Sequence, residues 1–491
     1  MTPTATPRAG GVEGAWPTTP RERSWGPLAV FGLSVSTAVA TWCFLIGGYV
    51  AYYLPAASGT LVMIAGGLVG ILLIFLALVP VGTRYGVDSI VSTKPQLGER
   101  GSYLALLIAY ITLIGWNTVL LIFLGRAAAE ILITLGVLGE GARQAVMVVS
   151  GLVGVAVVWW LLRGGPERMR NVGPWIASLV ILLGIWIFVL LVKEVGWSNL
   201  MDARPSAAAP DKLWNYTTGF ELLVVSALSW WPYVGGMARQ ASGGVRRALW
   251  PALIGLSLPL SIVSVVGLLA GLAVPDSGGD PTTFLVDLGG VASGIPALLF
   301  IVLANIGTVM VGLYAVTLGV RQVPAIQRHQ SWSGTLLLSL VPVAAIIVLI
   351  PNTFFDNVDT LLAFMGVVFA PMCGMQIADY YLLRRQRLDV RSLFVAGGAY
   401  RFWGGVNPAG VLALASGFVT YLLLLDPVNY TSNSPYEYIS ASLPSAFVAA
   451  VVYLLVTRLV VIPAGKGGYP SAQSAERPVV PAAGGSAAPP A

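Results

Sequence analysis

Long apolar segments recur along the whole sequence and set the strongest limit on how it can fold. About 20 consecutive apolar residues are enough for a helix to cross the roughly 30 Å of hydrocarbon in a bilayer. By that measure the 491-residue chain contains twelve candidate spans. We therefore predict an all-α polytopic membrane protein with twelve transmembrane helices, at approximately 27–53, 58–80, 102–124, 142–162, 174–195, 217–237, 251–274, 294–320, 333–350, 360–382, 408–425 and 442–462.

The composition supports a membrane protein and argues against an enzyme. Hydrophobic residues make up 56% of the chain and charged residues only 10%, whereas about a quarter of the residues in soluble domains are charged. The single histidine, His329, lies in a polar loop, and the cysteines Cys43 and Cys373 lie inside apolar runs. We therefore expect no histidine metal site, no disulfide, no organic cofactor and no enzyme activity.

Charged residues in the loops predict the orientation of the bundle. Arginines and lysines gather in alternate loops, which should be cytoplasmic, whereas the opposite loops are acidic. Both termini are thus predicted to be cytoplasmic in a multi-pass protein of the cell membrane, and the net charge of +6 reflects orientation rather than nucleic-acid binding. A transmembrane domain at 27–462 should lie between disordered tails at 1–26 and 463–491, which are rich in small and turn-forming residues.

The stretch from Ser229 to Arg239, S-W-W-P-Y-V-G-G-M-A-R, predicts an interrupted helix. Pro232 removes a backbone donor, and Gly235 and Gly236 relax the backbone, so the helix should break or loosen here. In hydrocarbon, broken helices are tolerated only where the freed groups face protein, water, an ion or a substrate, and in transporters they build the binding site. The alternative is a helix that simply ends at the cytoplasmic surface.

A second interruption is expected five runs earlier. Run 27–53 carries small and hydroxyl residues at mid-depth and the pair Gly47-Gly48 near its outer end. Interruptions at corresponding places in two halves are the pattern of inverted repeats with a site at the membrane midplane. The repeats would be 27–195 and 217–382, with the last two helices, 408–462, outside them. Glycine pairs have an alternative explanation, because small residues also let helices pack closely.

A few polar residues lie deep in the apolar runs and are candidates for a site. The indole of Trp116 can stack on a planar ring, and the amide of Asn117 offers a donor and an acceptor, although packing between helices is an equal alternative. Asn305 and Thr308 share a helix face and could supply oxygens to a cation, or could bond to a neighbouring helix. The carboxylates near the ends of runs are expected to be solvated or salt-bridged rather than functional: Glu130, Glu221 and Asp379.

The end of run 360–382 and the loop after it carry the most specific motif. They read F-A-P-M-C-G-M-Q-I-A-D-Y-Y-L-L-R-R from Phe369, followed by G-A-Y-R-F-W-G-G-V-N-P-A from Gly398. With E-R-S-W-G-P from Glu22, G-T-R-Y-G-V-D from Gly82 and E-R-G-S from Glu99, this text resembles the nucleobase:cation symporter family, which contains cytosine permeases and a hydantoin permease. The resemblance implies a leucine-transporter-like fold, a 5+5 inverted repeat followed by two C-terminal helices.

The resemblance also implies roles for individual residues. Trp116 falls on the family's ring-stacking tryptophan. The family has a glutamine where this chain has Leu120, and Asn117 is a candidate to take over the hydrogen bonds of that glutamine. The family's tryptophan in the run at 217–237 falls on Ala227, which leaves Ser229 and the two tryptophans that follow it as substitutes. The candidate substrate-binding residues are Trp116, Asn117, Ala40, Ser229, Trp230, Trp231, Gly235, Gly236 and Thr308, and the candidate sodium-site residues are Ser36, Val39 and Asn305.

These inferences predict a secondary active symporter that imports a nucleobase or a related planar nitrogen heterocycle, of the cytosine, purine, uracil, allantoin or hydantoin type. The coupling ion would be sodium or a proton. The alternatives are a transporter of the same fold for an amino acid or a vitamin-like ring, and a membrane sensor that does not transport. The expected partners are the small heterocyclic substrate and the lipid bilayer, with no nucleic acid and no obligatory protein partner.

Overall fold

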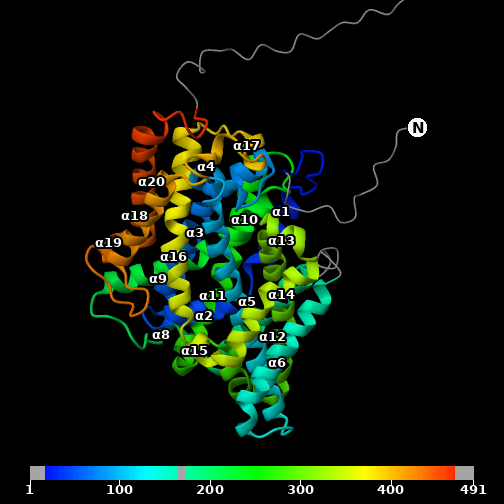
Figure 1. Ribbon diagram of the computed structural model, residues 1–491. Helices are drawn as coiled ribbons and strands as arrows, with labels where there is room; N and C mark the ends of the chain where they lie inside the picture. The colour runs from blue at the N-terminus through cyan, green and yellow to red at the C-terminus, as the bar shows by residue number, and fades with distance from the viewer. Residues whose placement is uncertain (1–16, 164–172, 470–491) are drawn as a thin grey trace, which may run out of the picture.

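The computed structural model describes residues 17–163 and 173–469, and the side chains of 173–177 are outside that description. Helices make up nearly all of its regular structure, and only isolated β-bridges are found in the described part (Figure 1). The helices are α1 (Pro27–Ala38), α2 (Trp42–Ala51), α3 (Ala56–Tyr85), α4 (Lys94–Leu97), α5 (Ser102–Thr134), α6 (Arg143–Leu162), α7 (Gly173–Glu194), α8 (Trp197–Asp202), α9 (Lys212–Leu228), α10 (Trp231–Ala238), α11 (Val245–Ala273), α12 (Pro281–Val320), α13 (Pro324–His329), α14 (Trp332–Leu349), α15 (Pro351–Asp356), α16 (Val358–Ile377), α17 (Val390–Phe394), α18 (Pro408–Leu424), α19 (Tyr436–Ile439) and α20 (Ser442–Val456).

Each of the twelve predicted runs coincides with one helix or a pair of helices. Within the described residues, eight helices are long and apolar enough to cross a membrane, or nine if α1 and α2 count as one bent span. The run at 217–237 falls short by this measure because a break divides it into helices of 17 and 8 residues. The described residues therefore form a membrane-type helical protein.

The two interruptions are present, but not at the glycines that suggested them. Between α1 and α2 the chain bends by 64°, at the non-helical residues 39–41. Gly47 and Gly48 lie inside α2, where a Cβ would collide with the backbone of α11 and of the loop at Gly278. This pair therefore serves close packing, the alternative considered above.

The break in the second interrupted helix lies at the start of the predicted stretch, before the proline and the glycines that suggested it. Helix α9 ends at Leu228 and α10 begins at Trp231, so the break is at Ser229 and Trp230. Pro232 stands near the start of α10, where a missing N–H costs nothing. Gly235 lies inside α10 against the backbone of Asp88 and Ser89, so it too permits close packing.

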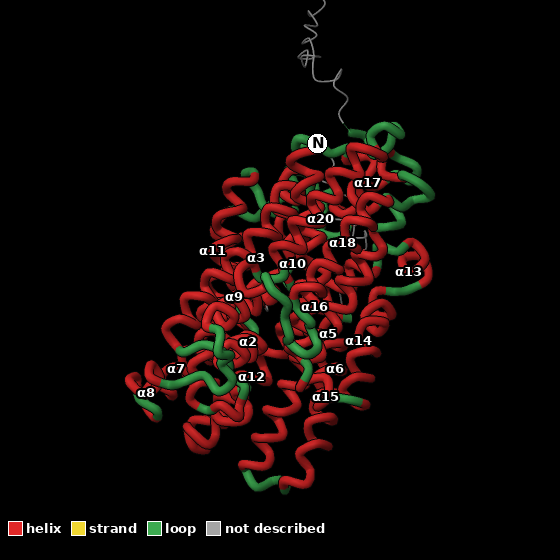
Figure 2. The backbone as a smooth tube through the Cα atoms, turned by 90° about the vertical axis from the view of Figure 1, so that its left-hand side faces the viewer, coloured by secondary structure: helices red, strands yellow, loops and turns green. Residues whose placement is uncertain are grey.

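The loops around α4 and α17, which are rich in arginine, lie together at one end of the bundle, at the top of Figure 1. We call this the arginine-rich end, and the end that carries α15 the aspartate-rich end. Figure 2, turned by 90°, shows the helices running between the two ends. Both described ends of the chain lie at the arginine-rich end, as Figure 1 shows.

The predicted tail boundaries are wrong by several residues at each end. Residues 17–26 are held in place: the Arg23 guanidinium donates to the Thr83 carbonyl, and the Trp25 backbone pairs with that of Ala241. Residues 463–469 contribute the Gly467 carbonyl, which accepts from Arg384. The remainder of the predicted tails, residues 1–16 and 470–491, lies outside the described part of the chain.

Candidate functional site

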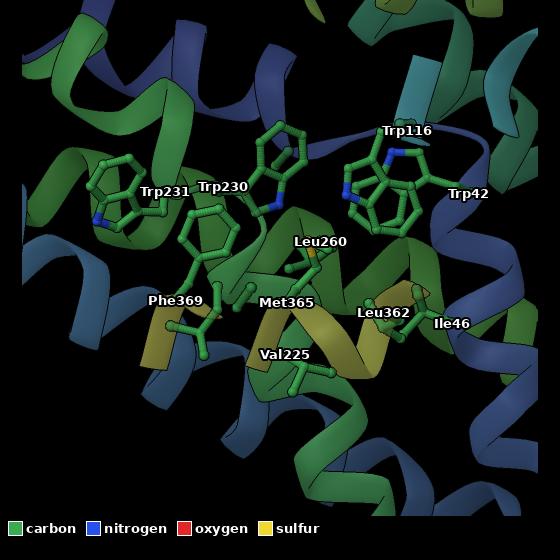
Figure 3. Packing of buried hydrophobic residues seen from close by; sticks show 14 of the residues in the cluster. Trp42, Ile46, Trp116, Val225, Trp230, Trp231, Leu260, Leu362, Met365 and Phe369 are labelled. Atoms are coloured by element: carbon green, nitrogen blue, oxygen red, sulfur yellow. The ribbon is translucent and has the colours of Figure 1, made fainter. Parts of the chain in front are cut away.

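Three tryptophans from three separate elements meet near both helix breaks (Figure 3). Trp42 is the first residue of α2, Trp116 lies on α5, and Trp230 lies between α9 and α10. The rings of Trp42 and Trp116 are stacked, with centroids 4.3 Å apart and planes 29° apart. Trp42 and Trp230 are 5.6 Å apart at 34°. We call these three residues the tryptophan cluster.

The tryptophan cluster contains unsatisfied hydrogen-bond donors. The indole Nε1 atoms of Trp116 and Trp230 are buried and have no hydrogen-bond partner among the described residues. Burying a donor without an acceptor is costly, and native interiors rarely leave such groups unpaired. Two indole N–H groups are therefore available for a ligand that carries acceptors on its edge.

Polar groups on α5 and α10 converge beside the same rings. A Cβ at Gly312 of α12 would collide with Asn117 Oδ1 and would stand 3.2 Å from the Tyr233 hydroxyl. Gly312 therefore leaves room for the Asn117 amide next to α12. The Tyr233 ring lies 5.2 Å from that of Trp230, which joins this amide and hydroxyl to the tryptophan cluster.

The break between α1 and α2 is tied to α12 by one side-chain contact. The Thr41 hydroxyl donates to Asn305 Oδ1, while Asn305 Nδ2 is buried and unpaired among the described residues. Val39 and Ala40 lie in the same non-helical segment, and both are fully buried. The contact thus brings together candidates from the runs at 27–53 and 294–320 that were predicted separately.

Other predicted site residues lie elsewhere or serve packing. Trp231 points away from the cluster in Figure 3, stacks on Phe369, and donates from Nε1 to Gln376 Oε1 at 2.9 Å. The Ser229 and Thr308 hydroxyls donate to carbonyls within their own helical turns. The backbone N–H of Gly235 donates to Ser89 Oγ, a Cβ at Gly236 would meet nothing within 4 Å, and Ser36 lies on α1 one turn before the break.

Sequence reasoning missed three residues that the structure places at the site. Trp42 was a recognisable candidate, because it is a tryptophan deep in an apolar run, as Trp116 is. Tyr233 lies inside the stretch that predicted the break. Thr41 carried no signal of its own, since its role depends on Asn305, which is 264 positions away in the chain.

The arginine-rich end contains a fully buried ion pair. Arg384 Nε lies 2.7 Å from Asp379 Oδ2, and both side chains are 1% exposed or less. Gln96, Tyr453 and Tyr469 also donate to the Asp379 carboxylate. The sequence expectation that this carboxylate is salt-bridged is confirmed, and the pair joins the segment after α16 to α4 and to residues 467–469.

Arg126 of α5 connects several elements at the aspartate-rich end. Its guanidinium lies 3.1 Å from Asp280, at the start of α12, and 3.8 Å from Asp356, at the end of α15. It also lies 3.8 Å from the centre of the Phe355 ring. These contacts connect three elements at the end of the bundle opposite Arg384.

The other two carboxylates have different partners. Glu130 forms an ion pair with Arg143, 2.6 Å away, as expected. Glu221 is instead buried against the amino end of α20, where the backbone N–H and the hydroxyl of Ser442 donate to it. Glu221 therefore fastens α9 to α20 through hydrogen bonds.

Comparisons with known proteins agree with this architecture. The family described as permeases for cytosine/purines, uracil, thiamine and allantoin matches residues 17–439. The hydantoin permease of Microbacterium maritypicum is 22% identical over 447 residues, which cover 82% of this chain and 83% of the relative. The purine-uracil permease NCS1 of Arabidopsis thaliana is 22% identical over 471 residues, covering 90% and 76%.

A solved structure has the same fold. The inward-facing conformation of Mhp1 aligns with a TM-score of 0.75 at 17% identity, and the alignment covers 95% of this chain and 97% of that one. Mhp1 in a closed conformation, described as a nucleobase-cation-symport-1 family transporter with bromovinylhydantoin bound, aligns with a TM-score of 0.71. At this identity the likeness establishes the fold.

Proposed function

Because the chain belongs to the family of permeases for cytosine/purines, uracil, thiamine and allantoin, we propose that it is a secondary active symporter for a nucleobase or a related planar nitrogen heterocycle. The observation that carries the proposal is the tryptophan cluster between the two helix breaks, with two buried indole N–H groups that have no partner among the described residues. Aromatic faces can stack on a planar ring, and the unpaired donors can bind the carbonyl or ring nitrogens on its edge.

The proposed architecture has twelve crossings. Repeats at 27–195 and 217–382 rock against each other about the site, and the helices at 408–462 lie outside them. Both termini are cytoplasmic, since the arginine-rich end carries the excess of basic residues. The presence of both described chain ends at that end of the bundle supports an even number of crossings.

The substrate ring stacks on Trp116, and Asn117 reads its edge. The space over Gly312, which holds the Asn117 amide near the Tyr233 hydroxyl, supports this assignment. Of the other substrate candidates, Ala40 lies in the break just before Trp42, and Trp230 is itself a member of the tryptophan cluster.

The coupling cation, sodium or a proton, acts at the break between α1 and α2. Backbone oxygens near Ser36 and Val39 and the side-chain oxygen of Asn305 are the proposed sodium ligands. The Thr41 to Asn305 hydrogen bond supports this proposal because it holds α12 against the break. A membrane potential of about 100 mV contributes about 2.3 kcal/mol per charge moved, or close to fifty-fold accumulation.

The test is uptake of radiolabelled cytosine into proteoliposomes under an imposed sodium or proton gradient. Unlabelled uracil, adenine, allantoin, hydantoin, thiamine and leucine serve as competitors. Trp116→Ala should abolish uptake, whereas Trp250→Ala, which removes a tryptophan that is 59% exposed on α11, should not. Gradient-driven uptake that only leucine inhibits, or no inhibition by any planar ring, would reject the proposed substrate class.

A further inference from the structure

The indole of Trp42 packs against two other indoles. Its ring is stacked on that of Trp116, with planes 29° apart, and is tilted by 34° against that of Trp230, so both of these rings contact it (Figure 3). All three side chains are at most 4% exposed. The face of Trp116 that is available for stacking on this side is therefore already covered by a ring from the protein itself.

This ring fills the space without satisfying the polar groups around it. An indole carries one N–H donor and no edge acceptor. It therefore offers nothing to the buried N–H groups of Trp116 and Trp230, both of which stay unpaired. A planar heterocycle with carbonyl or ring-nitrogen acceptors could fill the same volume and also pair these donors. The space that the Trp42 ring fills against these two rings, which we call the ring slot, is chemically better matched to such a ligand than to Trp42.

Trp42 lies directly after a bend that can act as a hinge. It is the first residue of α2 and follows the non-helical residues 39–41, where the chain bends by 64°. Residues at the ends of helices absorb the dihedral changes of hinge motions in many proteins. A change of backbone dihedrals at Val39 or Ala40 would move the Trp42 ring relative to Trp116, which sits in the middle of the continuous helix α5.

We propose that Trp42 is a displaceable occupant of the ring slot, which covers Trp116 while no substrate is bound and leaves when a substrate ring stacks there. The inference rests on the proposed function for the identity of the substrate, but not for the existence of the slot. Substrate binding must then displace Trp42. The apparent dissociation constant is therefore the intrinsic one divided by the fraction of molecules in which Trp42 is out of the slot.

The size of the effect follows from the two ring contacts that displacement breaks. Each aromatic contact of this kind corresponds to about a two- to tenfold change in an equilibrium constant. Removing the Trp42 ring should therefore strengthen substrate binding by about fivefold or more. Because indole is a fused bicycle, the vacated slot should accept a bicyclic ring such as adenine as well as a monocycle such as hydantoin.

The decisive experiment compares two variants, each of which removes one of the two tryptophans of the stacked pair. Equilibrium binding of radiolabelled cytosine, adenine and hydantoin is measured on purified wild-type protein, Trp42→Ala and Trp116→Ala, with the exposed Trp250→Ala as control. Tighter binding by Trp42→Ala together with weaker binding by Trp116→Ala is expected. Weaker or unchanged binding by Trp42→Ala, while the wild type still binds, would overturn the inference and leave the proposed function standing.

A second measurement tests the ring slot without relying on any substrate. Free indole at millimolar concentration should raise the thermal stability of Trp42→Ala, because it refills the vacated slot, and should not stabilise the wild type. If Trp42→Ala does not fold, Trp42→Leu, which also lacks a planar ring, takes its place in both assays. Absence of stabilisation by indole in the folded variant would overturn the inference, whereas failure of every heterocycle in gradient-driven uptake would reject only the proposed function.

Discussion

Replacing Arg384 with methionine should lower the free energy of unfolding by about 3–5 kcal/mol, the usual cost of removing one partner of a buried ion pair. Methionine keeps most of the length of the side chain, so the change removes chiefly the charge and its hydrogen bonds. Arg384 donates to Asp379, Gly467 and Pro95, and its guanidinium lies 4.2 Å from the centre of the Tyr469 ring.

The loss of unfolding free energy should fall at the lower end of that range, because the Asp379 carboxylate keeps other hydrogen-bond donors. Asp379 retains hydrogen bonds from Gln96 at 2.7 Å, from Tyr469 at 3.0 Å and from Tyr453 at 3.2 Å. Asp379→Asn leaves a buried guanidinium with only neutral partners, and we expect it to cost at least as much. The double variant, Arg384→Met with Asp379→Asn, should be less destabilised than the sum of the two single variants.

Equilibrium unfolding in mixed micelles, titrated with a denaturing detergent and followed by tryptophan fluorescence, measures these differences. Arg387→Met is the matched control, since Arg387 is exposed and lies three positions away. An exposed substitution of this kind should stay within about 0.5 kcal/mol of the wild type. If Arg384→Met were no more destabilising than Arg387→Met, or if the single effects simply added, the ion pair could not be what holds the arginine-rich end together.

Three further perturbations test other parts of the molecule. Gly312→Ala should weaken cytosine binding about tenfold in folded protein, because the added Cβ displaces the Asn117 amide. Gly184→Ala is the control and should bind cytosine normally, since a Cβ at Gly184 meets nothing within 4 Å. Equal binding by both variants would show that Asn117 is not part of the site. Glu221→Leu should lower the free energy of unfolding by about 1–3 kcal/mol in the same detergent titration, since it leaves donors at the amino end of α20 unpaired. Glu221→Gln keeps an acceptor there, so a Glu221→Gln variant that is just as unstable would argue against that reason. Arg126→Gln removes the charge that contacts Asp280 and Asp356, and should shift the population about two- to tenfold toward a state open at the aspartate-rich end. The measurement is the distance between spin labels on α5 and α15, which should lengthen. An unchanged distance would contradict this expectation.

The helices themselves follow largely from local sequence. Whether about 20 residues can cross a bilayer as a helix depends on their own hydrophobicity, so each predicted run coincides with helix in the structure. The family motifs are equally local, because they are short strings such as I-A-D-Y-Y at Ile377. The match to the permease family over residues 17–439 confirms the assignment that these motifs suggested.

The positions of the breaks could not be read from local sequence. A glycine pair in an apolar run is compatible with a bend or with close helix packing, and the sequence does not distinguish them. Gly47 proved to be a packing residue because the Ser264 carbonyl of α11 lies where its Cβ would be. Pro232 is compatible with continuous helix from Trp231 onward, because it occupies the first turn.

The sequence by itself determined that this chain is a helical membrane protein of a permease family, with Trp116 and Trp230 among its candidate site residues, since hydrophobic length and motif identity are properties of contiguous residues. Only the tertiary structure decided that Trp42 contacts both of these rings, that Thr41 bonds to Asn305, and that Trp231 packs elsewhere. Each of these outcomes depends on how α2, α5, α12 and the α9–α10 break are placed against one another. That placement is set by steric fit between segments far apart in the chain, which no periodicity within one segment records.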